Sequence, residues 1–305
     1  MSDCALVVGM GSIGTRHARL LSELGLDVAA VSQRGAAAQR CYPSLADAFE
    51  CETPHYVVIA NETARHRETV TSLAELGFTG TVLVEKPLFD RPAPPPTHRF
   101  AGLYVGYNLR FHPLLLELRR LLVSERALSA HVYVGQYLPD WRPGRDYRAT
   151  ASASRAAGGG VLRDLSHELD YLLWLFGACE RVAALSAQCE TLQIDTDAVQ
   201  GLLLSFERCP VVTAQLNYLD RQAARELVIN TPAQTIRADL IRGTLRIDGG
   251  DRHFVVDRDA TYLDQHRSAL GNHRDRLCTA EEGATTLALI AAAERAAAEQ
   301  QWIAP

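Results

Sequence analysis

The sequence predicts an α/β protein: an N-terminal doubly wound parallel sheet, followed by a C-terminal α+β domain with a large, mostly antiparallel open sheet. Residues 1–107 alternate short apolar runs with helical stretches, which is the pattern of a parallel sheet. A glycine-rich turn separates the first apolar run from the first helical stretch. Beyond residue 130, alternating strand patterns follow one another with few helices between them, as in antiparallel sheets. We therefore expect two domains, over residues 1–107 and 108–305.

Composition fits a globular enzyme with two domains. The chain has 305 residues, 47% of them hydrophobic, and domains usually contain ~100–200 residues. A net charge of −5 without a long basic run argues against nucleic acid as a partner. No apolar segment approaches the ~18–20 residues needed to cross a bilayer. The seven cysteines show no metal spacing and indicate reduced, buried thiols. A strand beginning at residue 4 leaves no room for a signal peptide, so we expect a cytoplasmic protein without a metal site.

Helices are expected where apolar residues recur with helical spacing. In the first domain these are residues 12–24, residues 64–76 and a short capped helix at 44–49. Residues 110–122 form an amphipathic helix at the start of the second domain, and residues 283–301 form a final alanine-rich helix. Strands are expected at 5–8, 28–31, 81–84, 130–134, 201–206, 211–217, 226–230, 235–239 and 243–248.

Prolines interrupt the first domain at residues 92–96, which read Pro-Ala-Pro-Pro-Pro. Proline cannot occupy the interior of a helix, because its ring clashes with the preceding turn and it lacks a backbone donor. We therefore predict that residues 88–101 contain no crossover helix and run extended along the surface.

The turn at residues 9–14 reads Gly-Met-Gly-Ser-Ile-Gly and has the GxGxxG spacing of dinucleotide-binding sites. It lies between a strand and a helix, which is the context that this motif requires. Gly9 permits the tight turn, Gly11 lets a pyrophosphate approach the backbone, and Gly14 allows close packing of helix on strand. The helix N-terminus adds N–H donors and a partial positive charge, so we predict a nucleotide here.

The end of the second apolar run indicates which nucleotide. An NAD site usually has Asp or Glu there to accept a hydrogen bond from the ribose 2′-hydroxyl, but this chain has Ser32, Gln33 and Arg34. Ser32 can bond a 2′-phosphate, and Arg34 can pair with it or stack on adenine. Arg34 as a surface loop residue is the alternative. We predict NADP(H) as the preferred cofactor, with NAD as the second choice.

Lys86 lies in Glu85-Lys86-Pro87, directly after the apolar run at 81–84. That run predicts a buried parallel strand, and open α/β sheets bind ligands at the carboxyl ends of such strands. A lysine there can contact both cofactor and substrate, while Pro87 restricts the backbone. A surface lysine that closes a strand is the alternative, but the motifs before and after it favour a functional role.

A triple-glycine segment at 158–160 precedes a helical stretch that contains Asp164 and His167. The glycines allow close approach to a ligand. Residues three apart on a helix share one face, so we expect Asp164 and His167 to lie side by side. A histidine paired with a carboxylate suits general acid–base catalysis.

Residues 136–148 mix aromatic residues with three arginines. Trp and Tyr stack on sugar faces, and Asp and Arg hydrogen-bond hydroxyls, carboxylates or phosphates. A solvated connection is the alternative for such a loop. The arginines make an anionic substrate plausible.

In the order and spacing of its motifs, the chain resembles the glucose–fructose oxidoreductase / inositol dehydrogenase / MocA (Gfo/Idh/MocA) family of nicotinamide-dependent oxidoreductases. The resemblance spans nearly the whole length, in the segments 9–14, 57–63 with His66, 85–87, 106–113, 158–171 and 278–283. It implies a Rossmann domain at 1–107 that binds the cofactor and a domain at 108–305 that binds substrate and assembles a homodimer or homotetramer through its sheet. It also implies that Lys86 and His167 flank the reacting carbon.

The expected cofactor contacts come from the turns at the strand ends: Gly9, Gly11, Ser12, Ile13, Gly14, Ser32, Gln33, Arg34, Ala60, Asn61, Glu62, Thr63, His66, Glu85, Lys86 and Asn108. The expected substrate contacts are Lys86, Tyr137, Trp141, Arg145, Tyr147, Asp164 and His167.

The chain departs from the family in two places. Asp164 and His167 are three residues apart, whereas relatives usually have four, so one residue is missing between them. The proline run replaces the usual crossover helix. His167 is the first candidate for the proton donor, with Asp164 and Tyr147 as alternatives.

The expected reaction is hydride transfer between nicotinamide and the alcohol or carbonyl carbon of a sugar, cyclitol or nucleotide-sugar-like substrate. His167 would move the hydroxyl proton, Asp164 would orient it, and Lys86 would stabilise developing negative charge. Two alternatives share the fold: a non-catalytic nucleotide-sensing regulator, and a reductase of a non-sugar substrate.

Overall fold

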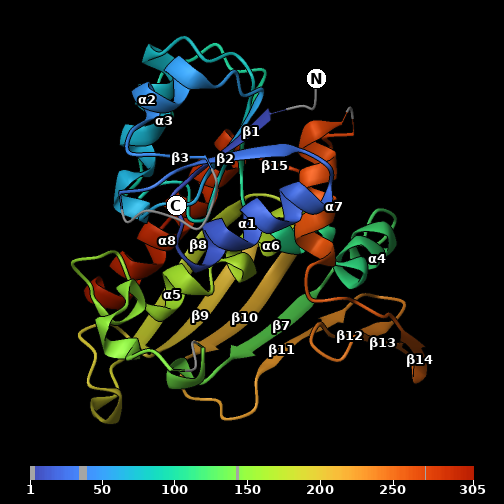
Figure 1. Cartoon of the computed structure of the whole chain (residues 1–305). Helices are drawn as coiled ribbons and strands as arrows, with labels where there is room; N and C mark the ends of the chain where they lie inside the picture. Colours follow the sequence, from blue (N-terminus) through green and yellow to red (C-terminus); the bar gives the residue numbers. More distant parts are fainter. Residues whose placement is uncertain (1–3, 34–39, 142–143, 272) are drawn as a thin grey trace. The chain divides into compact units, whose positions relative to one another are not determined.

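The computed structural model describes residues 4–33, 40–141, 144–271 and 273–305, in two compact units (Figure 1). The first unit contains residues 1–111 and 257–287, and the second contains residues 112–256 and 288–305. The division at 111/112 lies close to the predicted boundary at 107/108. Residues 257–287, however, group with the first unit, because helix α7 (Ala260–Leu270) packs on α1 (Ser12–Glu23) and on the 3₁₀ turn at Asn108–Phe111.

The first unit is a doubly wound sheet, as predicted. Its strands lie in the order β15-β6-β5-β4-β1-β2-β3, and all pairs are parallel except that of β15 with β6. The order reverses between β1 and β4, which is the topological switch point of a Rossmann sheet. The strands are β1 (Cys4–Val8), β2 (Asp27–Val31), β3 (Cys41–Tyr42), β4 (Tyr56–Ile59), β5 (Thr81–Val84), β6 (Gly102–Val105) and β15 (Cys278–Thr279).

Two helices begin at a side-chain cap, and a third follows a 3₁₀ turn. α2 (Leu45–Cys51) follows Ser44, whose hydroxyl accepts a hydrogen bond from the Asp47 N–H. α3 (His66–Glu75) follows a short 3₁₀ turn. α8 (Ala280–Glu299) begins with a reciprocal capping box, in which Thr279 and Glu282 each accept a hydrogen bond from the other's backbone N–H.

The connection from β5 to β6 contains no helix, which confirms the prediction for residues 88–101. The proline run is extended and lies partly at the surface, where Pro92 and Pro94 are exposed. The Arg67 guanidinium donates to the Pro94 carbonyl at 2.6 Å and ties this segment to α3. A parallel crossover is therefore made by extended chain.

The second unit is built on an eight-stranded sheet in the order β14-β13-β12-β11-β7-β10-β9-β8. Every pair is antiparallel except β7 with β10, so the prediction of a mostly antiparallel sheet is confirmed. The strands are β7 (Ser129–Gly135), β8 (Cys179–Ala187), β9 (Val199–Phe206), β10 (Cys209–Asn217), β11 (Ala224–Asn230), β12 (Thr235–Asp239), β13 (Thr244–Ile247) and β14 (Gly250–His253).

Side chains alternate across this sheet, so that one face is buried and the other is open. Helix α5 (Val161–Asp164) packs on β9 and β10, followed by α6 (His167–Phe176), and α4 (Pro113–Leu121) packs on α6. On the open face, Leu185, Leu203 and Val211 are exposed by 72%, 40% and 51%.

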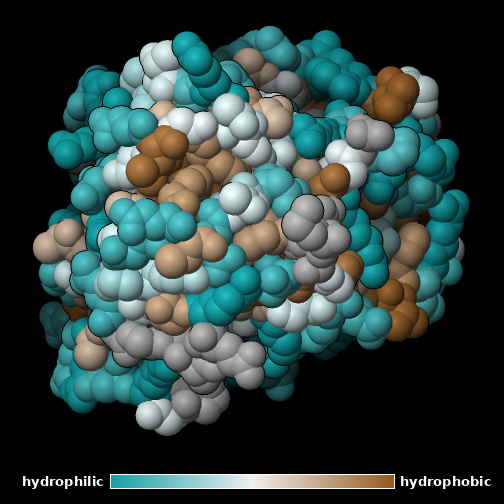
Figure 2. Space-filling view, turned by 45° about the horizontal axis from the view of Figure 1, so that its top comes forward, coloured by the Kyte–Doolittle hydropathy of each residue, from teal (hydrophilic) through white to brown (hydrophobic). Residues whose placement is uncertain are grey.

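The surface drawn in Figure 2 is mostly hydrophilic, and its apolar side chains form small separate groups. Among residues 4–33, 40–141, 144–271 and 273–305, no helix is both long enough and apolar enough to span a membrane. All seven cysteines are described and none forms a disulfide. Only Cys209 and Cys278 are buried, so the expectation that all seven are buried thiols was wrong.

Candidate active site

The glycine turn after β1 meets the loop after β4 at the switch point. Gly9 has a φ of +94°, and a Cβ added there would lie 2.5 Å from the backbone of Asn61. A Cβ at Gly14 would lie 1.8 Å from the Gly9 carbonyl oxygen. These two glycines therefore allow the loops and the helix to approach one another, which is a structural requirement of the turn.

Gly11 has a different role, because a Cβ there would meet nothing within 4 Å. It is the N-cap of α1 and provides no side-chain cap, and the next residue, Ser12, is exposed. The space beside Gly11, at the start of α1, is therefore open. This arrangement fits the pyrophosphate of a dinucleotide, which helix N-termini bind through N–H groups and the helix dipole.

The loop after β4 is tied to the segment after β5 by His66. Its ring nitrogens lie 3.1 Å from the Pro87 carbonyl, 3.2 Å from that of Leu88 and 3.2 Å from that of Asn61. Burial lowers the pKa of His66. His66 thus holds two ligand-edge loops together, and its contact with a cofactor stays a prediction.

The other predicted cofactor residues of this loop differ in exposure. Ala60 is buried, Thr63 is half-buried and Glu62 is exposed. The Asn61 amide donates to the Thr69 hydroxyl at 2.9 Å, while its Oδ1 is buried without a hydrogen-bond partner in the described part of the chain. An acceptor of this kind fits a ligand donor.

At the end of β2, the Ser32 N–H donates to the Tyr42 carbonyl at 3.0 Å, and Gln33 is exposed. Arg34 lies outside the described residues. The described part of this turn does not test the predicted preference for NADP(H), which stays a prediction from the sequence.

Lys86 follows β5 directly and is half-buried. It is the only lysine in the chain: of the 31 lysine and arginine residues, all others are arginines. Arginine cannot replace the compact ammonium of lysine at a site that needs a point charge. The presence of a single lysine is a signal in the sequence that supports a specific role for Lys86. The prediction for Lys86 was made without it.

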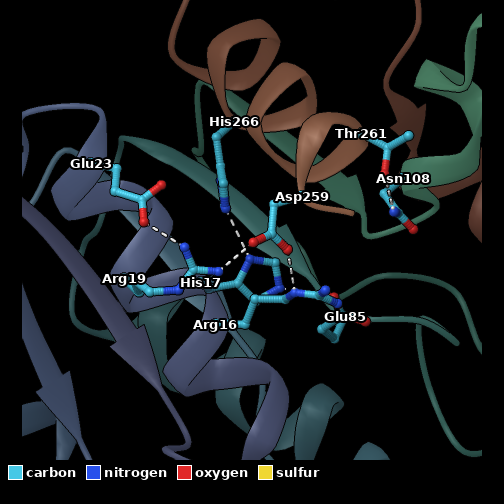
Figure 3. A network of polar contacts seen from close by, with 9 residues as sticks. All are labelled: Arg16, His17, Arg19, Glu23, Glu85, Asn108, Asp259, Thr261 and His266. Carbon is cyan, nitrogen blue, oxygen red and sulfur yellow. Dashed lines mark hydrogen bonds and ion pairs between the residues drawn. The ribbon is translucent and has the colours of Figure 1, made fainter. Parts of the chain in front are cut away.

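Glu85 precedes Lys86 and is 8% exposed. Its Oε1 lies 2.9 Å from Nε2 of His17 (Figure 3). Its Oε2 accepts a hydrogen bond from the Lys86 N–H at 3.1 Å. Asn108, another predicted cofactor residue, is buried and donates to the Thr261 hydroxyl on α7 at 2.7 Å.

In the second unit, the helix breaks between Asp164 and His167. Asp164 is the last residue of α5 and His167 is the first of α6, with Leu165 at φ −98° and ψ 31° between them. The prediction that they share one face of a single helix was therefore wrong. A turn at Leu165 and Ser166 replaces continuous helix.

Asp164 is held by a residue from β10's end. The Tyr218 hydroxyl donates to Asp164 Oδ2 at 2.6 Å, and the Tyr218 ring meets the edge of Trp141 at 5.3 Å between centroids. The indole Nε1 of Trp141 is buried without a hydrogen-bond partner in the described part of the chain. The structure thus brings together Asp164 and Trp141, with Tyr218 between them.

Three other predicted substrate residues show no hydrogen bond or ring contact with Asp164, Tyr218 or Trp141 in the contacts described for them. The Tyr147 hydroxyl donates to the Leu192 carbonyl at 2.9 Å, and Arg145 is exposed. The Tyr137 ring is covered by the Arg221 guanidinium at 3.4 Å from its centroid.

Sequence reasoning did not single out a buried ion pair nearby, between Glu168 and Arg225 at 2.8 Å. Glu168 is completely buried on α6. Burial, together with the Glu168 charge, raises the pKa of Tyr171 well above its ordinary value. The pairing spans α6 and β11, and no local sequence pattern could have indicated it.

Two family models cover most of the chain. Residues 4–94 match the oxidoreductase family with an NAD-binding Rossmann fold, and residues 117–237 match the GFO/IDH/MocA C-terminal domain. The chain belongs to the Gfo/Idh/MocA family. Membership confirms the predicted fold and the assignment to nicotinamide-dependent oxidoreductases. No curated protein sequence matches the chain.

Solved structures of the family share the fold at low identity. GenD2 from gentamicin A biosynthesis, in complex with NAD, has a TM-score of 0.82 and 21% identity, over 100% of this chain and 96% of its own. The WlbA dehydrogenase from Bordetella pertussis, in complex with NADH and UDP-GlcNAcA, has a TM-score of 0.79 and 20% identity, over 100% and 99%. A levoglucosan dehydrogenase in complex with NADH has a TM-score of 0.83 and 15% identity, over 100% and 99%.

Proposed function

We propose that the protein is an NADP(H)-dependent dehydrogenase or ketoreductase. Its substrate would be a sugar, cyclitol or nucleotide-sugar-like molecule with an alcohol or carbonyl at the reacting carbon. The observation that carries this proposal is the position of Lys86: the only lysine of an arginine-rich chain follows β5 at the ligand edge of a Rossmann sheet. The sugar-related structures of the same fold support the substrate class.

Each residue would act on one atom of the substrate. The Lys86 ammonium would donate to the reacting oxygen and stabilise its developing negative charge during reduction. His167 would exchange the hydroxyl proton, with Asp164 or Tyr147 as the other candidates. Bound nicotinamide would supply or accept the hydride. Trp141 would offer a flat apolar surface to a sugar ring, and Arg145 is available to an anionic group.

The preference for NADP(H) rests on residues 32–34, where no carboxylate is present to bond a ribose 2′-hydroxyl. Ser32 and Arg34 would bind the 2′-phosphate. The family and the solved structures are described with NAD or NADH, so NAD is the competing cofactor.

Assembly as a homodimer or homotetramer would use the open face of the eight-stranded sheet. Leu185, Leu203 and Val211 come from the adjacent strands β8, β9 and β10 and are exposed there. Contact with a second copy would remove these apolar side chains from water. A cytoplasmic location fits seven cysteines without a disulfide.

The test is a screen of NADPH-linked reduction over keto-sugars, keto-cyclitols and nucleotide-linked keto-sugars, and of the reverse reaction over their alcohols. Lys86→Arg keeps the charge but changes its shape, so turnover should fall about 100-fold with cofactor affinity retained. Arg99→Lys, at an exposed position, is the control. Cofactor binding without turnover on any substrate would favour a nucleotide sensor, and activity only on imines or tetrapyrroles would favour a non-sugar reductase.

A further inference from the structure

Four buried side chains of the first unit form a continuous line of hydrogen bonds that ends at Glu85. The Tyr56 hydroxyl lies 3.0 Å from Nδ1 of His266, and Nε2 of His266 lies 2.9 Å from Nδ1 of His17. Nε2 of His17 lies 2.9 Å from Glu85 Oε1. Figure 3 shows His17, from α1, between His266 of α7 and Glu85. Four segments distant in sequence, β4, α7, α1 and the end of β5, are thus joined at the residue before Lys86.

The proton positions along this line follow from Tyr56. Its side chain is completely buried, and in the described part of the chain its hydroxyl contacts one acceptor, the ring of His266. A buried hydroxyl must place its proton on an acceptor, so the hydroxyl donates to Nδ1 of His266. His266 then carries its proton on Nε2 and donates to His17. His17, in turn, donates from Nε2 to the Glu85 carboxylate.

The opposite direction leaves one proton without an acceptor. If Nδ1 of His17 donated to His266, His266 would donate to the Tyr56 oxygen, and the hydroxyl proton would have no acceptor. Burial, together with the neighbouring His17, lowers the pKa of His266 well below 6.5. The line of hydrogen bonds therefore runs in one direction, toward the carboxylate.

Glu85 is consequently an anion held at both oxygens, by His17 and by the Lys86 N–H. Burial alone would raise the pKa of Glu85, but the hydrogen bond and electrostatic interaction with His17, followed by the charge of Lys86, lower it from its ordinary value of 4.5. Gly106 leaves room for the carboxylate, since a Cβ there would lie 3.1 Å from Oε1.

The other groups around His17 are on α1 and α7. The Tyr262 ring meets the edge of His17 at 5.7 Å between centroids. Arg16 pairs with Asp259 at 2.7 Å, and Arg19 pairs with both Asp259 and Glu23, so that two arginines face two carboxylates (Figure 3). These charges compensate one another, so Glu85 is the anion that His17 serves.

We propose that His17, supported by His266 and Tyr56, is a positioning residue for Lys86: it fixes Glu85 as an oriented carboxylate, whose hydrogen bond from the Lys86 N–H holds the neighbouring lysine in place. The same helix presents its N-terminus to the cofactor, so α1 would set the distance between cofactor and lysine. This inference rests on the catalytic role proposed for Lys86, and its test does not require a substrate.

The single lysine makes the test direct. Protein grown with lysine labelled with ¹³C at Cε gives one side-chain resonance, that of Lys86, and its shift against pH reports protonation of the adjacent Glu85. Glu85→Gln should abolish the acid inflection and thereby assign it. Arg99→Lys adds an exposed lysine as a reference in the same sample.

Two amide variants of His17 differ by one methylene and separate the roles of its two nitrogens. Gln places its amide nitrogen where Nε2 lies and keeps the contact with Glu85. Asn places it near Nδ1 and loses that contact. We expect the acid inflection of His17→Gln to match that of the wild type, and that of His17→Asn to rise by about one pH unit or more. Circular dichroism over the same pH range confirms that each variant is folded.

Turnover is measured on the same variants with any substrate found in the screen. We expect His17→Asn to lower kcat at least about 10-fold without raising the Kd for NADPH, and His17→Gln to restore it. An unchanged acid inflection in His17→Asn, or an equal shift in both variants, would overturn the positioning role of His17. If the inflection behaves as expected but Lys86→Arg stays active, His17 does position Glu85, and the catalytic role proposed for Lys86 is wrong.

Discussion

Nε2 of His17, in the middle of α1, lies 2.9 Å from the carboxylate of Glu85, at the end of β5. The contact joins the helix that follows the glycine turn to the residue beside Lys86. The first turn of this helix follows the glycine turn that we propose binds a dinucleotide, and its second turn contacts Glu85. In our proposal, one helix would therefore organise both the cofactor site and the position of the lysine.

The glycine turn gives a matched pair of variants. Gly14→Ala should lower the melting temperature by several degrees, because its Cβ would lie 1.8 Å from the Gly9 carbonyl oxygen. Gly11→Ala should fold normally, since its Cβ meets nothing within 4 Å, but it should weaken dinucleotide binding at least about 10-fold by filling space meant for the pyrophosphate. Thermal melts and fluorescence titration with NADPH measure both effects. Unchanged affinity in Gly11→Ala would place the pyrophosphate elsewhere.

Cofactor preference should depend on residues 32–34. We expect NADPH to bind more tightly than NADH, and Arg34→Ala to lose about 1.5–3 kcal/mol of NADPH binding with little change for NADH. Ser32→Asp should reverse the preference, because the carboxylate repels a 2′-phosphate and accepts from a 2′-hydroxyl. Parallel titrations with both cofactors decide this, and equal affinities in the wild type would contradict it.

The proton donor can be identified by three substitutions. His167→Ala should lower turnover at least about 100-fold, with NADPH affinity nearly unchanged. Asp164→Asn should have a smaller effect, since Tyr218 still has a side-chain acceptor at that position. Tyr147→Phe should be nearly silent, because its hydroxyl donates to the Leu192 carbonyl. If His167→Ala is fully active while Asp164→Asn or Tyr147→Phe is inactive, the proton donor is Asp164 or Tyr147 and not His167.

Stability should depend on pH through His112. Its Nδ1 accepts from the Leu114 N–H and caps α4, its Nε2 donates to the Leu240 carbonyl, and burial lowers its pKa to about 4 from 6.5. Between those values the unfolded chain takes up a proton that the folded chain does not, so stability is complete above pH 6.5 and is lost as pH falls toward 4. The loss should be about 2 kcal/mol between pH 7 and pH 5.

His112→Asn isolates that contribution, because asparagine also caps helices but does not titrate. Urea unfolding of both proteins at pH 7 and pH 5 should show a smaller decrease for the variant. An equal decrease in the two proteins would mean that His112 does not supply this pH dependence.

The sequence alone determined the doubly wound first sheet, its glycine turn and the position of Lys86. These features depend on local chemistry: apolar runs become buried strands, glycines permit a tight turn, and prolines exclude a helix between β5 and β6. The same local rules predicted most strands of the second sheet, because alternation of polar and apolar residues marks a half-buried strand.

The tertiary structure decided what local patterns do not contain. Helix α7 was not predicted, because two of its buried residues, Gln265 and His266, are polar and weaken its apolar periodicity. Strands β8 and β14 lie at the edges of the second sheet, where β8 is rich in alanine and β14 is wholly exposed, so neither has a clear strand pattern. The break between Asp164 and His167 depends on a turn that a shared helical face did not predict.

The line of hydrogen bonds from Tyr56 to Glu85 shows why local sequence patterns do not predict such contacts. Its hydrogen-bonded neighbours are separated by 68, 210 and 249 residues in the sequence, and each alone resembles an ordinary core or surface residue. Folding removes them from water together, so each polar atom must find its partner among the others. The sequence identifies the lysine at the sheet edge. Only the tertiary structure brings His17 of α1 and His266 of α7 to the neighbouring Glu85.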